Sequence, residues 1–151
     1  MFRKSATLLA GALLAASTTA MAESDAEKAV EYRESVFHVM GHNFKPMAGM
    51  VKGKIAYDAE EFATRAKRVA QLAHMPLEGF KEGTADVSGT DAKASIWDNW
   101  DDFTGKMETL QEKSAELAKV AEGGDMEAIK PKFMAVGKAC KSCHDDYKKE
   151  D

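Results

Sequence analysis

The chain contains 151 residues, of which 44% are hydrophobic and 30% are charged, and its formal net charge is −4 at pH 7. This length corresponds to a single globular domain. The acidic balance and the lack of any basic cluster argue against nucleic acid or an anionic membrane surface as a partner.

The N-terminus has the three parts of a secretory signal. Arg3 and Lys4 give a positive start, residues 6–16 form a short apolar run, and residues 20–22 supply a small-residue cleavage pattern. The run is shorter than the roughly 20 residues that span a bilayer, so we expect a cleaved signal peptide and no membrane anchor. The mature domain, residues 23–151, is expected in the periplasm. Because the leader holds two bases and no acid, its removal lowers the formal charge from −4 to −6.

The mature sequence has helical periodicity almost throughout. Apolar side chains recur at three- and four-residue intervals, which is typical of amphipathic helices. Ser24 and Glu27 form a capping box at the first helix, and Pro46 is expected to kink or end this helix. No sheet is expected. The four predicted helices span residues 24 to 44 or at most 51, 58 to 73, 94 to 122 and 126 to 149.

The connection before the third helix, residues 74–93, is the longest irregular stretch. Loops of this length in compact domains usually carry a function or cover a site. We expect Leu77 and Phe80 to anchor it. In the third helix, Trp100 belongs to the apolar face. Trp97 falls outside that face and is expected to pack beneath the loop, with a partner surface as the alternative. This organisation predicts an all-α, antiparallel four-helix bundle, a fold that holds cofactors between facing helices.

The fourth helix carries the sequence Cys140-Lys141-Ser142-Cys143-His144. C-x-x-C-H is the attachment motif of c-type haem, in which the thiols bind the porphyrin and the imidazole binds the iron. On a helix the two cysteines lie about 60° apart on one face, with the histidine beside them. We therefore expect one haem c per chain, covalently attached through Cys140 and Cys143, with His144 as an axial ligand of the iron.

The alternative to a haem protein, from a different functional class, is a haem-free thiol-redox or metal-binding protein. A redox C-x-x-C usually accompanies a βαβ pattern, and this sequence has none. A zinc site needs about four ligands, and the chain has only two cysteines. Both observations favour haem attachment.

Further motifs make the mature chain resemble the class II c-type cytochromes, specifically the cytochrome c′ family. The haem motif lies near the C-terminus, whereas the commoner class I cytochromes carry theirs near the N-terminus. The other shared motifs are Glu31-Tyr32-Arg33-Glu34-Ser35, Val51-Lys52-Gly53 before Tyr57-Asp58, Ile96-Trp97, and Val136-Gly137 leading into the haem motif and Asp145-Asp146-Tyr147-Lys148. The resemblance covers the whole mature domain and implies a four-helix bundle that carries haem.

The resemblance also implies roles for particular residues. It implies a haem with one protein ligand, His144, and a sixth position covered by an apolar side chain of the first helix, here Phe37. It implies a homodimer formed through the first and second helices. It also implies Lys148 on the proximal side, whereas the residues alone leave open a solvated lysine in the Lys148-Lys149 pair near the chain end. It places Arg33 near a haem propionate. An arginine on an apolar stripe independently requires an anionic partner, which a propionate supplies.

The residue that faces the iron decides the function. Phe37 and Met40 share the inward face of the first helix with Arg33. His38 and His42 fall on the opposite face, where an exposed pair is the ordinary interpretation and a surface metal site the alternative. Met40 as sixth ligand would give a six-coordinate, low-spin electron carrier, whereas as a core residue it would only fill space. The resemblance favours Phe37 over the iron.

An open position beneath Phe37 predicts a five-coordinate haem that binds NO and CO. An apolar ring donates no hydrogen bond to bound dioxygen, so uncharged diatomics that depend less on that bond are favoured. Such a haem can also exchange electrons with a redox partner. We expect no enzymatic role, because no acid–base pair that could cleave a peroxide accompanies Phe37.

Overall fold

The computed structural model of the protein describes residues 24–150. The predicted signal peptide, residues 1–22, lies outside the described residues. The described chain is helical, with no strand beyond an isolated bridge between Ala92 and Lys148, and none of its helices is long and apolar enough to cross a bilayer. The elements in order are α1 (Asp25–Val51), α2 (Ala59–Leu72), the short 3-10 helix η1 (Pro76–Gly79), α3 (Ser95–Asp98), α4 (Trp100–Ala121) and α5 (Met126–Tyr147).

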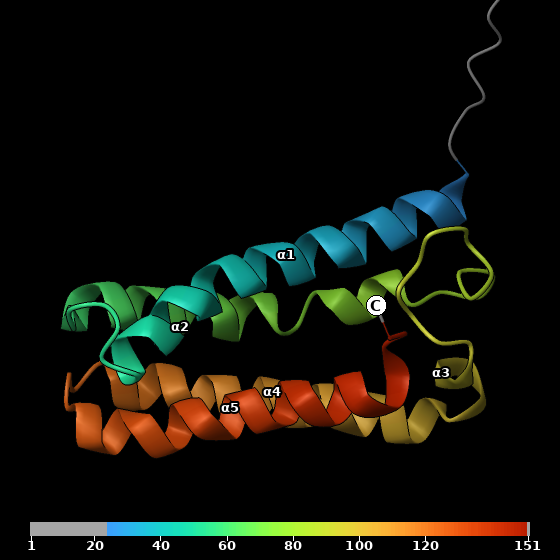
Figure 1. Cartoon of the computed structure of the whole chain (residues 1–151). Helices are drawn as coiled ribbons and strands as arrows, with labels where there is room; N and C mark the ends of the chain where they lie inside the picture. The colour runs from blue at the N-terminus through green and yellow to red at the C-terminus, as the bar shows by residue number, and fades with distance from the viewer. Residues whose placement is uncertain (1–23, 151) are drawn as a thin grey trace, which may run out of the picture.

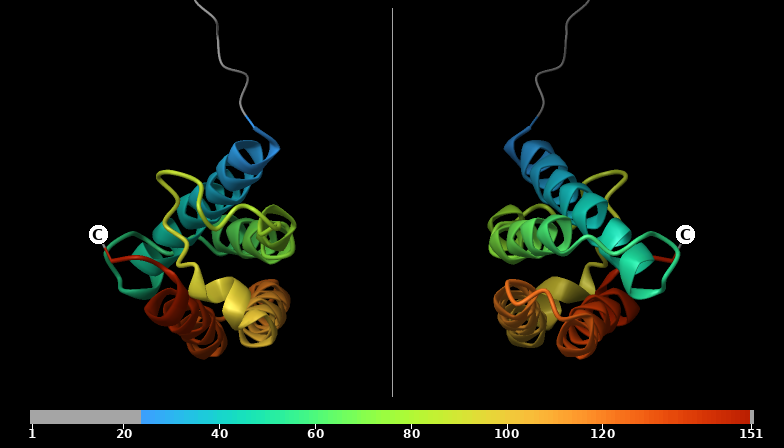
Figure 2. Two further views of the ribbon diagram at one scale, coloured as in Figure 1. Left: turned by 90° about the vertical axis from the view of Figure 1, so that its right-hand side faces the viewer. Right: turned by 90° about the vertical axis from the view of Figure 1, so that its left-hand side faces the viewer.

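The four long helices α1, α2, α4 and α5 form an antiparallel bundle (Figure 1). Viewed end-on, α1 and α2 form one layer, and α4 and α5 form the other (Figure 2). The layers are not parallel, because α1 slants away from α5 toward its own N-terminal end (Figure 1). The predicted all-α four-helix bundle is confirmed.

Helix α1 begins at the predicted capping box, in which Ser24 accepts from the Glu27 N–H and the Glu27 carboxylate accepts from the Ser24 N–H. Pro46 lies inside α1 and does not end it. This proline has no N–H to donate to the carbonyl of His42, four residues earlier. Arg65 of α2 approaches that carbonyl oxygen through Nη1 at 3.5 Å, so the neighbouring helix partly replaces the missing donor.

The helix expected over residues 94–122 is divided in two at Asn99. The backbone of Asn99 leaves the helical region (φ −127°, ψ 42°), and its side-chain Nδ2 donates to the carbonyl oxygen of Ser95 at 2.9 Å. Short polar side chains that bond to the backbone in this way favour helix ends. The interruption changes the helical phase and leaves Trp100 37% exposed. The prediction that Trp100 lies on the apolar face is therefore wrong.

Buried apolar side chains form two clusters. Helix α1 contributes methionines to the first and packs Phe37 against the second. The bundle core, between the four long helices, consists of Met40, Met47, Met50, Phe62, Ala66, Val69, Ala73, Leu110, Leu117, Ala121, Ile129, Phe133, Val136 and Ala139. The end cluster, which joins the loop after α2 to α3, α4 and the end of α5, consists of Phe80, Ala92, Ile96, Phe103, Met107 and Tyr147. Burial of these side chains supplies most of the driving force for folding.

The chain after α2 packs closely against α1 at Gly79. This glycine is buried, and a Cβ atom there would lie 2.6 Å from the carbonyl oxygen of Ala29 and 2.7 Å from the Cβ of Arg33. Both neighbours belong to the body of a helix and cannot turn away. Only a residue without a side chain permits this approach.

Gly79→Ala should lower the free energy of unfolding by about 1–3 kcal/mol, because the added methyl group must push η1 away from α1. Gly41→Ala is the matched control. A Cβ at this α1 position meets nothing within 4 Å, and replacing a glycine inside a helix stabilises by up to about 1 kcal/mol. Urea denaturation followed by circular dichroism measures both. A Gly79→Ala variant as stable as the parent would contradict the close packing.

Glu116 of α4 joins α4 to α5 through charged hydrogen bonds. Its carboxylate accepts from Nζ of Lys132 at 2.7 Å and from Nζ of Lys113 at 2.9 Å. These bonds hold the pKa of Glu116 down to about 2, below its usual value of 4.5. The carboxylate therefore stabilises the folded chain in its charged form.

Glu116→Gln should lower the free energy of unfolding at neutral pH, and the deficit should shrink as the pH falls from about 4.5 toward 2. A folded-state pKa below the unfolded value stabilises above that unfolded value and loses its effect as the carboxylate is protonated. Glu108→Gln is the control, since Glu108 is exposed on the same helix and forms no ion pair within residues 24–150. Thermal unfolding at a series of pH values tests this, and a pH-independent deficit would count against it.

Candidate functional site

The C-x-x-C-H motif lies on the last turns of α5, where both cysteines are free thiols in partly buried positions. Cys140 packs against the bundle core and Cys143 against the end cluster. Burial raises the pKa of Cys140, and it raises the pKa of Cys143 to about 11. Two neutral thiols one helical turn apart thus face the interior at the junction of the two clusters.

His144 follows directly and is exposed near the end of α5. Its backbone carbonyl oxygen accepts from the Lys148 N–H at 3.0 Å. Desolvation by surrounding protein atoms, and then the positive charge of Lys148, lower the pKa of His144. The ring is therefore kept neutral, which is the form that binds a metal.

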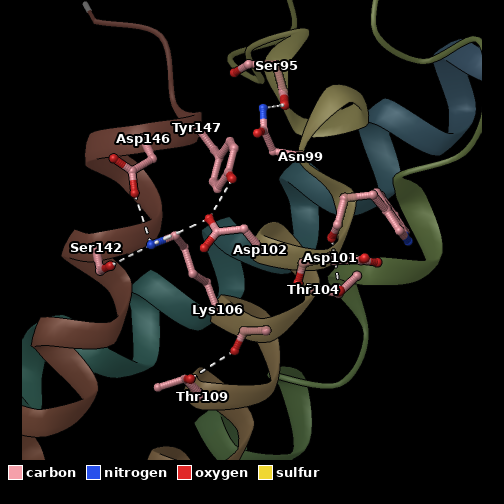
Figure 3. Close-up of polar contacts among 12 residues, drawn as sticks. Ser95, Asn99, Asp101, Asp102, Thr104, Lys106, Thr109, Ser142, Asp146 and Tyr147 are labelled. Atoms are coloured by element: carbon pink, nitrogen blue, oxygen red, sulfur yellow. Dashed lines mark hydrogen bonds and ion pairs between the residues drawn. The ribbon is translucent and has the colours of Figure 1, made fainter.

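Helix α4 holds this end of α5 in place through a polar network (Figure 3). The Tyr147 hydroxyl donates to Asp102 at 2.6 Å, and this bond raises the pKa of Tyr147 to about 12. Lys106 forms an ion pair with Asp146 at 3.0 Å and donates to Ser142 Oγ at 3.1 Å. The turn that carries the motif is thereby bound to α4 at several points.

Sequence reasoning missed this network. Asp102 and Lys106 are four residues apart on one helix, which is a detectable spacing for an ion pair. Nothing in the sequence indicates that both face α5, because the relative rotation of two helices is decided by tertiary packing.

Phe37 and Met40 belong to different clusters, although they are only three residues apart on α1. Phe37 is half-buried against the end cluster, and its ring meets Phe80 edge-on with centroids 6.4 Å apart. Cys143 packs against the same cluster. Met40 is 6% exposed and belongs to the bundle core. The structure therefore brings Phe37 and Cys143, far apart in sequence, to one cluster.

Arg33 is buried to 1% exposure, one turn before Phe37. Its Nη1 donates to the Gly79 carbonyl and to Thr84 Oγ1, each at 2.9 Å. Its Nη2 donates to Thr90 Oγ1 at 2.7 Å and to the Thr84 carbonyl at 3.5 Å. These partners are neutral oxygens of the loop, and burial lowers the pKa of Arg33.

Trp97 packs beneath the loop as predicted, with its ring centroid 6.3 Å from that of Phe80. The Arg33 guanidinium lies 5.9 Å from the Trp97 ring. The indole Nε1 of Trp97 is buried and has no hydrogen-bond partner in the described chain. Buried donors without acceptors are rare, so the Trp97 indole N–H points to an acceptor that the described chain does not supply. Sequence reasoning missed this donor.

The residues present fit haem c on three independent points. The two thiols face inward on one helix turn beside a neutral imidazole. The unpartnered indole N–H of Trp97 matches a carboxylate of a haem edge. Phe37 supplies an apolar surface at the same cluster as Cys143.

The remaining candidates lie at the surface. His38, His42 and His74 are exposed, and within residues 24–150 no group of three or more histidine, cysteine or carboxylate side chains could hold a metal ion. Lys148 forms an ion pair with Asp91 at 3.5 Å. Its positive charge still contributes, after desolvation, to the lowered pKa of His144.

Known proteins match nearly the whole described chain. The family model described as Cytochrome C' matches residues 28–148. The cytochrome c′ of Halomonas halodenitrificans is 46% identical over 132 residues, covering 84% of this chain and 100% of that protein.

Solved structures agree with the sequence matches. Cytochrome c prime from Shewanella frigidimarina has a TM-score of 0.81 at 43% identity, covering 85% of this chain and 100% of that one. The nitric oxide complex of a point mutant of cytochrome c prime from Alcaligenes xylosoxidans has a TM-score of 0.78 at 32% identity, covering 86% and 100%. Sequence, fold and the geometry around the end of α5 thus lead to one conclusion: the chain belongs to the cytochrome c′ family and carries haem c.

Proposed function

We propose that the protein binds NO and CO at a single haem c. The haem is attached through Cys140 and Cys143 and has His144 as its only protein ligand. When bound, this haem supplies an iron with one open coordination position, which can take a diatomic gas and change between the ferrous and ferric states. The observation that carries the proposal is the packing of Phe37 and Cys143 against one end cluster. The Alcaligenes xylosoxidans relative whose structure contains nitric oxide supports the choice of ligand.

Phe37 is the distal residue in this proposal, and Met40 is not a ligand. The Phe37 ring is half-buried and apolar, and its edge contact with Phe80 limits its motion. It offers no hydrogen bond and no base, which favours uncharged diatomics and a binding and carrier role rather than catalysis. Met40 is 6% exposed in the bundle core, so its thioether already has a packing role.

Three further residues complete the proposed site. Arg33 and Trp97 lie near one haem propionate, which accepts from the Trp97 indole N–H, a buried donor with no acceptor within the described chain. Lys148 lies on the proximal side, where its charge acts on His144. Arg33 thereby orders the loop through its hydrogen bonds and adds a positive charge beside the propionate.

The cellular compartment and the oligomeric state of the protein are part of the same proposal. We place the mature domain, residues 23–151, in the periplasm after removal of residues 1–22, where it exchanges electrons with a redox partner.

We also propose a homodimer through α1 and α2. Val39 of α1 is 49% exposed, and an apolar side chain of this kind gains by burial against a second copy. Mass spectrometry of the secreted chain and sedimentation of a Val39→Glu variant test these two points.

The ferrous protein should give a high-spin, five-coordinate absorption spectrum, and Met40→Leu should leave that spectrum unchanged. Leucine preserves the volume and apolar character of the core position but cannot ligate iron. A low-spin spectrum that becomes high-spin in Met40→Leu would instead identify Met40 as the sixth ligand. Haem staining of the denatured chain should be positive and should be lost in the Cys140→Ser, Cys143→Ser double variant. An unstained parent chain would support a haem-free protein.

Phe37→Ala should raise the CO association rate at least about tenfold, which corresponds to removing about 1.4 kcal/mol from the barrier. The smaller side chain no longer has to move aside. Phe44→Ala is the control, because the Phe44 ring stacks on Phe133 at 4.4 Å beside the bundle core. Flash photolysis measures both rates. Equal rates in the parent and Phe37→Ala would show that another residue limits access.

A further inference from the structure

Residues 84–93 form a strap between α1 and the end of α5. They cross from one layer of the bundle to the other at the end where α1 slants away from α5 (Figures 1 and 2). The strap contains no helix or strand, apart from the isolated bridge between Ala92 and Lys148. Its position therefore depends on the bonds at its two sides.

Arg33 holds the strap on the α1 side. Its guanidinium donates to Thr84 Oγ1 at 2.9 Å and to Thr90 Oγ1 at 2.7 Å. Both threonines are buried, with exposed fractions of 0% and 3%. Hydrogen bonds from a buried charged group are among the stronger ones in a protein.

The end of α5 holds the strap on the other side. Lys149 Nζ donates to the carbonyl oxygen of Thr90 at 2.8 Å, and the Lys149 N–H donates to the carbonyl oxygen of Asp91 at 2.8 Å. The Lys93 N–H donates to the carbonyl oxygen of Tyr147 at 2.9 Å. Tyr147 is also the residue that Asp102 fixes to α4.

Thr90 is the point where these two sets of bonds meet. Its side-chain hydroxyl accepts from Arg33 of α1, while its own carbonyl accepts from Lys149 after α5. We propose that Thr90 is a positioning residue that couples α1 to the end of α5 and so sets the separation of Phe37 from His144. The consequence for gas access rests on the proposed function, whereas the coupling itself does not.

The coupling has a physical cause in the burial of Arg33. Removal of the Thr90 hydroxyl leaves an N–H of a buried guanidinium unpaired, which is costly. Arg33 or the strap must then shift to recover an acceptor. Because the Thr90 carbonyl belongs to the same residue, a shift of the strap strains the bonds to α5.

The test compares Thr90→Val, Thr90→Ser and Thr84→Val in the haem-loaded protein. Thr90→Val keeps the side-chain shape but removes the hydroxyl, and Thr90→Ser restores the hydroxyl. Thr84→Val is the matched control, since it removes another hydroxyl bonded to Arg33 but leaves Thr90 intact. Amide hydrogen exchange is followed at Lys93 and Lys149, whose N–H groups join the strap to α5.

In Thr90→Val we expect exchange at Lys93 and Lys149 to accelerate about tenfold, the equivalent of one lost hydrogen bond. Thr90→Ser should restore the parent rate, and Thr84→Val should change these two amides less than Thr90→Val does. The CO association rate should rise in Thr90→Val as α1 moves away from α5. If Thr90 acted only within the strap, Thr90→Val would leave the CO association rate unchanged.

Two results would overturn the inference. Unchanged exchange at Lys93 and Lys149 in Thr90→Val would show that the two sides of the strap are independent. Faster exchange with an unchanged CO rate would show that the strap does not position Phe37. Failure of the gas-binding proposal is recognised separately, because the unaltered protein would then bind no CO.

Discussion

The burial of one positive charge, that of Arg33, organises the end of the molecule that contains the C-x-x-C-H motif. A guanidinium at 1% exposure is stable only if its donors find acceptors. The loop supplies them as the Gly79 carbonyl and the oxygens of Thr84 and Thr90. Phe80 adds its ring face 4.4 Å from the guanidinium carbon, a favourable contact for a cation. The loop is therefore ordered around a side chain of α1.

This arrangement supports the distal side of the proposed site. Phe80, held by Arg33, meets the edge of Phe37 and packs on Phe103 of α4 with ring centroids 4.7 Å apart. The proximal side has its own support, since Tyr147 is bound to Asp102 and packs against Phe103. Phe103 thus contacts both Phe80, on the distal side, and Tyr147, on the proximal side. A single aromatic cluster connects the helix of Phe37 with the helix of His144.

Prediction from sequence succeeded where a feature depends on neighbours along the chain. The capping box at Ser24, the long helices and the inward placement of the two cysteines follow from local spacing. Prediction failed at Trp100, because the helix breaks at Asn99, where helical periodicity alone shows no interruption. Pro46 is accommodated because Arg65 of another helix approaches the freed carbonyl, a compensation that no local pattern contains.

By itself the sequence determined the helical bundle, the presence of a haem-attachment motif near the C-terminus and the inward position of Arg33. Each of these follows from periodicity or from the chemistry of adjacent residues. Only the tertiary structure decided that Phe37 shares a cluster with Cys143 whereas Met40 lies in the bundle core. It also decided that Arg33 binds loop oxygens. These contacts join segments tens of residues apart, and their register depends on how whole helices pack rather than on the spacing within one helix.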